Sequence, residues 1–183
     1  YYYVITAVDQ TGNESTASSE ASIQSATLLQ IWRARYFSAA DLADPAKEAT
    51  VWGDSANPDG DVLSNLFEYA FETNPSNASS GPGSITHVNG IITQHGQPTL
   101  SIANTNTGVD FRVVFGRRKD HVAAGLTYMV QFSADLSGWE NRITTPTVVA
   151  SDPEPQPELD AVTVRYPFFL NSGKKAKFFR LQV

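Results

Sequence analysis

Apolar residues occupy every second position in much of the second half of the chain, and this alternation limits the fold more than any other feature. Tyr128, Val130 and Phe132 follow it within residues 127–133, and such a period places alternate side chains on opposite faces of a strand. Other short segments of strand composition, separated by turns such as Asn89-Gly90, are 85–88, 91–94, 99–103, 111–117, 143–150, 162–166 and 178–183. We therefore expect an antiparallel β-sandwich over residues 85–183.

Residues 1–8 alternate in the same way, and Asp9-Gln10-Thr11-Gly12-Asn13 supplies a turn toward a returning strand at 17–23. Two strands alone cannot bury a core, so this hairpin is expected to be marginal by itself.

Between these β regions the apolar period changes to 3.6 residues, which indicates helices. A first helix is expected after a cap at Ser25 or Thr27, with Trp32 anchoring a small core or, alternatively, stacking on a ligand. A second is expected from Ser38 to before Pro45. A third carries an apolar stripe and ends at Thr73-Asn74-Pro75; the stripe is Leu63, Leu66, Phe67, Ala70 and Phe71. The expected class is mainly β with a small α segment of two or three short helices.

The charge of the chain is concentrated in one segment. The 183 residues include 13 Lys and Arg against 19 Asp and Glu, a net charge of −6, yet residues 41–72 alone hold eight acidic residues and one lysine. The net acidity argues against nonspecific nucleic-acid binding, which needs cationic patches. The absence of cysteine excludes disulfides, thiol nucleophiles and cysteine-ligated metals.

Within the acidic segment, residues 57–68 have the spacing of a twelve-residue calcium loop. Oxygen-bearing side chains stand at positions 1, 3 and 5, a backbone carbonyl at 7, and a glutamate at 12 of the loop; these are Asn57, Asp59, Asp61, Leu63 and Glu68, with Asn65 at position 9. A shell made only of oxygen favours Ca²⁺ over Zn²⁺ or Cu²⁺. The alternative is a solvated acidic loop whose carboxylates stabilise the start of the next helix.

Val62 occupies the sixth loop position, where glycine normally provides a sharp turn with positive φ. A β-branched residue is strained in that conformation by roughly 1–3 kcal/mol. We therefore expect a reshaped turn, a weakened site or an inactive one.

Three segments resemble parts of known modules. The string YYYVITAVDQTGNES resembles the last hairpin of a fibronectin type III domain. Residues 32–70 resemble an EF-hand or thrombospondin type 3-like calcium segment found near the C-termini of large secreted bacterial proteins, through Trp32-Arg33, Phe37, the loop and the run LSNLFEYA at 63–70. The chain differs from this module at Asn57, which removes one charge, at Val62, and at Glu72, where the module often has glycine. Dockerins carry two such loops, and a single loop makes cellulosome docking an unfavoured interpretation.

The run YMVQFSADLSGW at 128–139 and the ending KFFRL at 177–181 resemble small β modules that follow this calcium segment in the same proteins. These resemblances imply four parts: a truncated fibronectin type III end at 1–24, a helical segment at 25–76, a linker at 77–84 and the sandwich at 85–183. They also imply a secreted or cell-surface protein whose signal peptide lies upstream of this fragment. No apolar run approaches the ~20 residues of a membrane span.

No catalytic pattern accompanies these motifs. His87, His95 and His121 are scattered, without a metal-binding pair, and no nucleophile elbow, phosphate loop or dinucleotide fingerprint is present. We therefore expect a non-enzymatic module that binds calcium and spaces or anchors the upstream domains of the same chain.

The alternative is a carbohydrate-binding module of a secreted polysaccharide-degrading enzyme. Its partner would be a polysaccharide or cell-surface glycan, and its stacking platform would consist of aromatic residues in the sandwich, Trp139, Tyr166, Phe168 and Phe169. The basic clusters at 117–119 and 174–177 are expected to be solvated turns, with contact to an anionic surface or glycan as the alternative.

Overall fold

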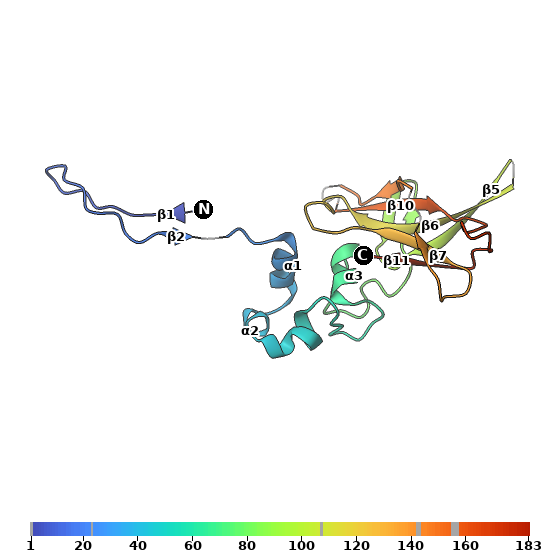
Figure 1. Cartoon of the computed structure of the whole chain (residues 1–183), viewed down its shortest axis with the longest axis horizontal. Helices are drawn as coiled ribbons and strands as arrows, with labels where there is room; N and C mark the ends of the chain where they lie inside the picture. The colour runs from blue at the N-terminus through green and yellow to red at the C-terminus, as the bar shows by residue number, and fades with distance from the viewer. Residues whose placement is uncertain (1, 23, 107, 142–143, 155–157) are drawn as a thin grey trace.

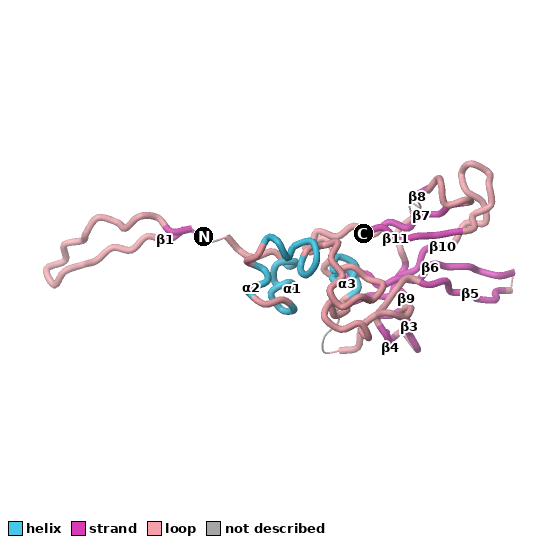
Figure 2. Tube along the Cα trace, turned by 90° about the horizontal axis from the view of Figure 1, so that it is seen from below, coloured by secondary structure: helices cyan, strands magenta, loops and turns pink. Residues whose placement is uncertain are grey.

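The computed structural model of the chain describes residues 2–22, 24–106, 108–141, 144–154 and 158–183. The predicted fold class is confirmed: strands predominate, and a few short helices form a small α segment. An N-terminal hairpin extends away from the rest of the molecule, the helices lie in the middle, and the sheets lie at the other end (Figure 1). The second view shows the same order along the long axis (Figure 2).

The N-terminal hairpin contains much shorter strands than the sequence predicts. β1 (Tyr2–Tyr3) pairs with β2 (Ala21–Ser22), and among the described residues of the hairpin the one further bridge joins Val8 and Glu14. Serine hydroxyls accept the amide hydrogens of Ile5 and Ala7 at 3.0 and 2.9 Å, in competition with a regular ladder. Residues 1 and 23, which the predicted strands include, lie outside the described residues. Side chains 3–20 are all exposed.

The helical segment begins with α1 (Leu28–Tyr36). Of the two predicted caps, Thr27 is the one used: its hydroxyl accepts the amide of Gln30, whose side chain accepts the amide of Thr27 in return. Trp32 is 5 % exposed and packs edge-on against Tyr69, as expected of a core anchor. The remaining elements before the acidic loop are α2 (Ala39–Leu42), capped by Ser38, the 3-10 turn η1 (Pro45–Lys47) and the π-helical turn η2 (Glu48–Trp52).

α3 (Asn65–Phe71) follows the acidic loop and is shorter than predicted at both ends. Leu63 precedes the helix, although its side chain still belongs to the core. The helix ends at Glu72, before Thr73-Asn74-Pro75, because Glu72 adopts a left-handed conformation with φ 53°. Glycine would adopt this conformation without strain.

Two sheets form the C-terminal part. The first has six strands in the order β3-β4-β9-β10-β6-β5 and the second has the order β11-β7-β8. Among the described strands of these two sheets, all pairings are antiparallel except one contact between β4 and β9. The strands are β3 (Thr86–Val88), β4 (Ile91–Gln94), β5 (Thr99–Thr105), β6 (Gly108–Arg118), β7 (Met129–Ser133), β8 (Glu140–Asn141), β9 (Thr147–Ser151), β10 (Leu159–Arg165) and β11 (Phe178–Gln182).

These strands correspond closely to the predicted ones, with two corrections. β8 was not predicted, and the segment predicted at 143–150 forms a strand only from Thr147; residues 142 and 143 lie outside the described residues. Asn89 and Gly90 both have positive φ, 51° and 79°, as the predicted hairpin turn requires.

The core lies on both faces of the six-stranded sheet, because neighbouring residues of a strand point to opposite sides. Val113 and Phe115 of β6 join the main cluster, together with Val130 and Phe132 of the three-stranded sheet. Val114 points the other way, into a second cluster with Ile85, Ile92, Ala150, Leu159 and Ala161. The two sheets therefore pack face to face as a sandwich.

α3 is docked onto the sandwich at its C-terminal end. Tyr128 donates its hydroxyl hydrogen to the carbonyl of Ala70 at 2.7 Å, and Arg118 at the end of β6 forms an ion pair with Glu72. In the segment 77–84, predicted as a linker, Gly81 is buried so closely that an added Cβ would lie 2.4 Å from the Thr73 side chain. The acidic loop is thus connected to the sheets through a short, packed helix.

Across the described residues, no helix combines the length and the apolar character needed to span a membrane.

Candidate metal centre

The acidic loop is closed at its base by backbone hydrogen bonds from the first residues of α3. The amide of Asn65 donates to the carbonyl of Ala56 at 2.9 Å, and the amide of Leu66 donates to that of Asp54 at 3.0 Å. The Asn65 side chain adds two bonds, to the carbonyls of Val51 and Gly53. Residues 57–64 are therefore held as a loop directly before the helix that carries Glu68.

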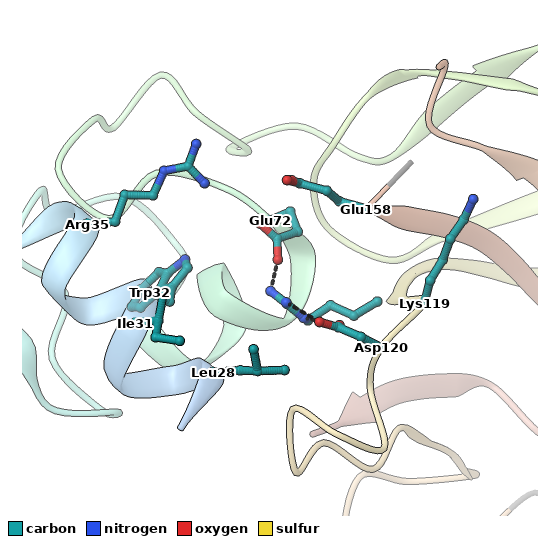
Figure 3. Close-up of a pocket in the computed structure, with 9 residues that line it drawn as sticks. Leu28, Ile31, Trp32, Arg35, Glu72, Lys119, Asp120 and Glu158 are labelled. Atoms are coloured by element: carbon teal, nitrogen blue, oxygen red, sulfur yellow. Dashed lines mark hydrogen bonds and ion pairs between the residues drawn. The ribbon is translucent and has the colours of Figure 1, made fainter. Parts of the chain in front are cut away.

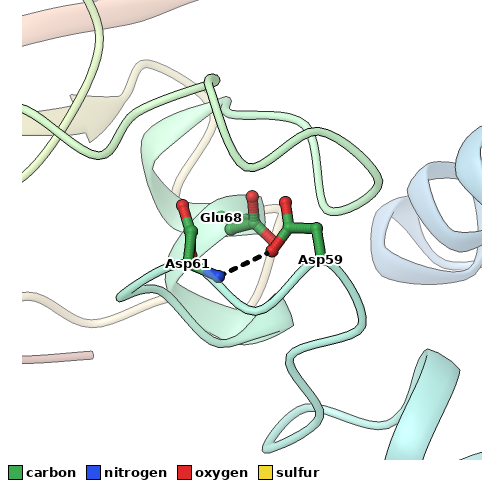
Figure 4. A group of neighbouring side chains, drawn as sticks. All are labelled: Asp59, Asp61 and Glu68. Atoms are coloured by element: carbon green, nitrogen blue, oxygen red, sulfur yellow. Dashed lines mark hydrogen bonds between the residues drawn. The ribbon is translucent and has the colours of Figure 1, made fainter.

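Three carboxylates of this loop and helix converge. Asp59, Asp61 and Glu68 each offer an oxygen, and these oxygens lie within 4.8 Å of one another (Figure 4). Asp59 and Asp61 are held by bonds along the loop, because the Asp59 carboxylate accepts the Asp61 amide at 3.2 Å and the Asp61 carboxylate accepts the Leu63 amide at 2.6 Å. The structure thus brings together three of the five predicted ligand residues.

Each of these carboxylates keeps one oxygen without a partner. Oδ2 of Asp59, Oδ2 of Asp61 and Oε2 of Glu68 are buried and form no hydrogen bond among the described residues. The other Glu68 oxygen accepts only a long bond, 3.4 Å, from the hydroxyl of Thr73. Buried carboxylate oxygens are normally paired or bound to a metal, so this group has an unsatisfied requirement for positive charge.

The electrostatics of Glu68 reflect that requirement. Its side chain is 0 % exposed, and burial, together with the charges of Asp59 and Asp61, raises the pKa of Glu68 to about 8. No ion pair found among the described residues brings a lysine, arginine or histidine to any of the three carboxylates. A bound cation would favour the ionised form and reverse this shift.

This arrangement could hold a metal ion. Three carboxylates with free oxygens at short mutual distances form an anionic, oxygen-only ligand set, and the hydrogen bonds of the loop orient two of them. Hard cations prefer such ligands.

Val62 does not have the strain expected at the sixth loop position. It is absent from the residues with positive φ and its side chain is 66 % exposed. The left-handed turn is made two residues earlier by Gly60, with φ 75° and open space around its α-carbon. Of the three expected outcomes, the structure shows the reshaped turn.

The other predicted ligand residues have structural roles in the loop. The Asn57 side chain accepts the Gly60 amide at 2.9 Å and donates to the Asp61 carbonyl at 2.7 Å, so it stabilises the turn. Leu63 contributes its side chain to the core. Ligation by the Asn57 oxygen or the Leu63 carbonyl stays a prediction. Sequence reasoning missed Thr73, since a bond across a helix end has no sequence pattern.

The aromatic residues of the alternative platform separate into two places. Tyr166, Phe168 and Phe169 line one pocket of about 450 Å³ with Phe111, and Phe168 is 54 % exposed. Trp139 lies elsewhere, with the Arg180 guanidinium 4.3 Å from its ring centre. Phe111 and Phe168 meet edge to face at 85°, so these rings do not form a coplanar row.

The scattered histidines do not join the carboxylate group. His95 lies between the Glu72 carbonyl and the Asp152 carboxylate, at 2.9 and 2.6 Å, where it links the end of α3 to the loop after β9. His121 contacts the Arg118 carbonyl.

Comparisons with known proteins add no assignment: no family model, no curated protein and no solved structure matches the chain.

Proposed function

We propose that this chain is a non-catalytic, calcium-binding structural module of a secreted or cell-surface multidomain protein. The observation that carries the proposal is the convergence of Asp59, Asp61 and Glu68, each with a buried oxygen that no hydrogen bond satisfies. A structural ion resolves this arrangement, because it supplies the positive charge that the fold itself does not bring there.

Calcium is the preferred ion for two reasons. The ligand set contains oxygen only, which disfavours Zn²⁺ and Cu²⁺. The ligands also come from an irregular loop and a helix, and Ca²⁺ accepts six to eight oxygens in irregular geometry, whereas Mg²⁺ demands a near-ideal octahedron. The Asn57 side chain, the Leu63 carbonyl and water would complete the shell.

The role of the ion would be mechanical. Asp59 and Asp61 belong to the loop, and Glu68 belongs to α3, so one ion would fasten the loop to the helix. Since α3 is bonded to the sandwich through Ala70 and Glu72, the ion would stiffen the connection between the helical segment and the sheets. In calcium-rich surroundings outside the cell, binding would stabilise the fold by mass action.

The N-terminal hairpin supports a place among other domains. Its side chains at 3–20 are exposed, including the apolar Val4, Ile5 and Val8. A neighbouring domain of the same protein would cover them, and the calcium segment would then set the spacing between that domain and the sandwich.

The test is titration of the full chain with Ca²⁺ by calorimetry, with thermal unfolding in Ca²⁺ and in EDTA. We expect saturable binding of one ion and a higher melting temperature in Ca²⁺. Glu68→Gln should abolish both effects, whereas Glu48→Gln, an exposed residue of the same acidic segment, should preserve them. Absence of heat together with an unchanged melting temperature would remove the proposal. Parallel titration with Mg²⁺ distinguishes the two ions.

The second candidate function is carbohydrate binding, favoured by the aromatic pocket of Phe111, Tyr166, Phe168 and Phe169. Exposed aromatic faces stack on sugar rings, although these rings are not coplanar. Affinity electrophoresis in gels containing soluble polysaccharides tests it. Phe168→Ala should lose any retardation, and Phe178→Ala, which removes an exposed ring outside the pocket, should keep it. Equal migration with and without every polysaccharide would exclude this function.

A further inference from the structure

A second site lies between α1 and the end of the sandwich, away from the carboxylate group. It is a pocket of about 290 Å³ with two walls of different character (Figure 3). One wall is formed by α1, and the other by Glu72 at the end of α3, by residues 118–120 at the end of β6 and just after it, and by Glu158, the residue before β10. Its size is near the lower end of the range for small-molecule sites.

The α1 wall is a single helical face. Leu28, Ile31, Trp32 and Arg35 have the i, i+3, i+4, i+7 spacing that places side chains on one side of a helix, and all four line the pocket. Leu28 and Ile31 make this wall apolar at its N-terminal end. Its C-terminal end carries the only charged residue of the four, Arg35.

Two groups on this wall lack the acceptor that their chemistry calls for. Trp32 is 5 % exposed, yet its indole Nε1–H has no hydrogen-bond partner among the described residues. Arg35 has no carboxylate partner within the described part of the chain. Its guanidinium lies 5.8 Å from the centre of the Tyr36 ring, as a cation–π contact. Buried N–H groups are normally paired, so the Trp32 indole calls for an acceptor, and the exposed Arg35 guanidinium adds a positive charge on the same face of the helix.

The opposite wall carries a surplus of negative charge. Arg118 is occupied by its ion pairs with Glu72 and Asp120, the latter at 2.8 Å. Lys119 also lines the pocket, and its ammonium lies 3.6 Å from Asp160, which does not line it. The exposed carboxylate of Glu158 is left on this wall, and no hydrogen bond or ion pair to it is found among the described residues. This wall is therefore suited to a cation.

We propose that this pocket binds a small zwitterion with an apolar side chain, of the class of the free α-amino acids. The carboxylate accepts hydrogen bonds from the Trp32 indole and the Arg35 guanidinium, the ammonium faces Glu158, and the side chain lies on Leu28 and Ile31. This assignment does not depend on the calcium proposal, because none of its residues belongs to the carboxylate group at Asp59, Asp61 and Glu68.

The test uses the indole resonance of Trp32 in a nitrogen–proton correlation spectrum of the full chain. The chain has three tryptophans, and Trp52→Phe and Trp139→Phe identify the Trp32 resonance by elimination without changing the pocket. The probes are L-leucine, N-acetyl-L-leucine, which lacks the ammonium, and L-leucinamide, which lacks the carboxylate. We expect L-leucine to shift the resonance saturably and the two derivatives to bind roughly tenfold more weakly or worse.

Substitutions at two exposed residues test which charged group of the ligand each residue binds. Arg35→Gln should weaken L-leucine roughly tenfold and leave L-leucinamide unchanged, because only the former has a carboxylate. Glu158→Gln should weaken L-leucine and leave N-acetyl-L-leucine unchanged. Arg33→Gln is the matched control: it lies on the same helix but contacts Asp54 and does not line the pocket, so it should bind as the parent does.

Three results would overturn the proposal. The first is no saturable shift with L-leucine at millimolar concentrations. The second is equal binding of L-leucine and either derivative, since the site would then not recognise one of the two charged groups of the ligand. The third is an equal loss in Arg35→Gln and Arg33→Gln, because the effect would then belong to the helix and not to the pocket.

Discussion

The acidic loop and α3 carry two groups of carboxylates, which differ in whether the fold supplies a positive charge to them. At the end of α3, Glu72 and the neighbouring Asp120 share the guanidinium of Arg118, which is supplied by β6. At the start, Asp59, Asp61 and Glu68 face one another, and no side chain among the described residues supplies a cation.

This difference shows two solutions to one physical problem. A buried carboxylate loses its hydration and needs positive charge in return. Where the chain provides that charge, as at Arg118, the contact is permanent and fixes α3 to the sandwich. Where the charge would have to come from solution, the contact would depend on the concentration of the ion, so under the proposed function the fold would have one constant attachment and one conditional attachment.

The largest expected effect comes from breaking the permanent attachment. Arg118→Met keeps the length of the side chain but leaves Glu72 without its cation, and loss of one partner of a buried pair costs about 3–5 kcal/mol of the free energy of unfolding. Denaturant unfolding measures it, in EDTA and in Ca²⁺ alike, and the loss should be the same in both.

The control for that variant is Arg165→Met. Arg165 lies 3.7 Å from Asp110, but its side chain is 68 % exposed, so the change should cost no more than about 1 kcal/mol. Similar losses in the two variants would mean that the Arg118 contact is not a buried attachment, and the comparison between the two ends would no longer hold.

The second largest effect is that of Ca²⁺ binding at Asp59, Asp61 and Glu68 on the free energy of unfolding. At a free Ca²⁺ concentration about one hundred times the dissociation constant, binding should add about 2.7 kcal/mol to the free energy of unfolding. Arg118→Met should retain this increment, because the two groups of carboxylates share no partner. An increment that disappears in Arg118→Met would show instead that the two ends act as one unit.

The sequence predicted the sandwich and the convergence of the three carboxylates for the same reason, which is that both depend on local spacing. Strand alternation and the Asn89-Gly90 turn are properties of consecutive residues, and so is the order of Asp59, Asp61 and Glu68. The backbone of the loop could not be predicted as well: the pattern pointed to strain at Val62, but Gly60 makes the left-handed turn.

What the sequence could not predict comes from contacts distant in the chain. The pairing of Arg118 with Glu72, the bond from Tyr128 to Ala70 and the pocket opposite Trp32 join elements more than 40 residues apart, and no residue pattern specifies them. The N-terminal strands were predicted too long, since the hydroxyls of Ser15 and Ser18 accept amide hydrogens at the positions of a regular ladder.

A third prediction concerns pH in the absence of calcium. Because burial raises the pKa of Glu68 to about 8 in the folded state, from an ordinary value of 4.5, folding favours the protonated form. The contribution of Glu68 to stability is complete below about pH 4.5 and is lost as the pH rises through about 8.

Denaturant unfolding in EDTA across this range measures the loss, and Glu68→Gln isolates it, because the amide cannot ionise. The parent should lose stability relative to Glu68→Gln as the pH rises, and Ca²⁺ should remove that relative loss. Parallel pH profiles for the two proteins in EDTA would show that Glu68 is already compensated in the fold, as Glu72 is.

The smallest expected effects come from glycine and alanine substitutions at Val62 and Gly60, the two positions at which the loop could make its left-handed turn. Val62→Gly should not tighten calcium binding, because Val62 has no left-handed strain to relieve, and it should destabilise the chain only slightly, by about 0.5–1 kcal/mol, through the greater freedom of the unfolded chain.

Gly60→Ala should cost about 1–2 kcal/mol, since alanine is strained at φ 75°, and should weaken binding because this turn separates Asp59 from Asp61. Calorimetric titration of both variants measures the dissociation constants, and tighter binding by Val62→Gly would show that the sixth position limits the site after all.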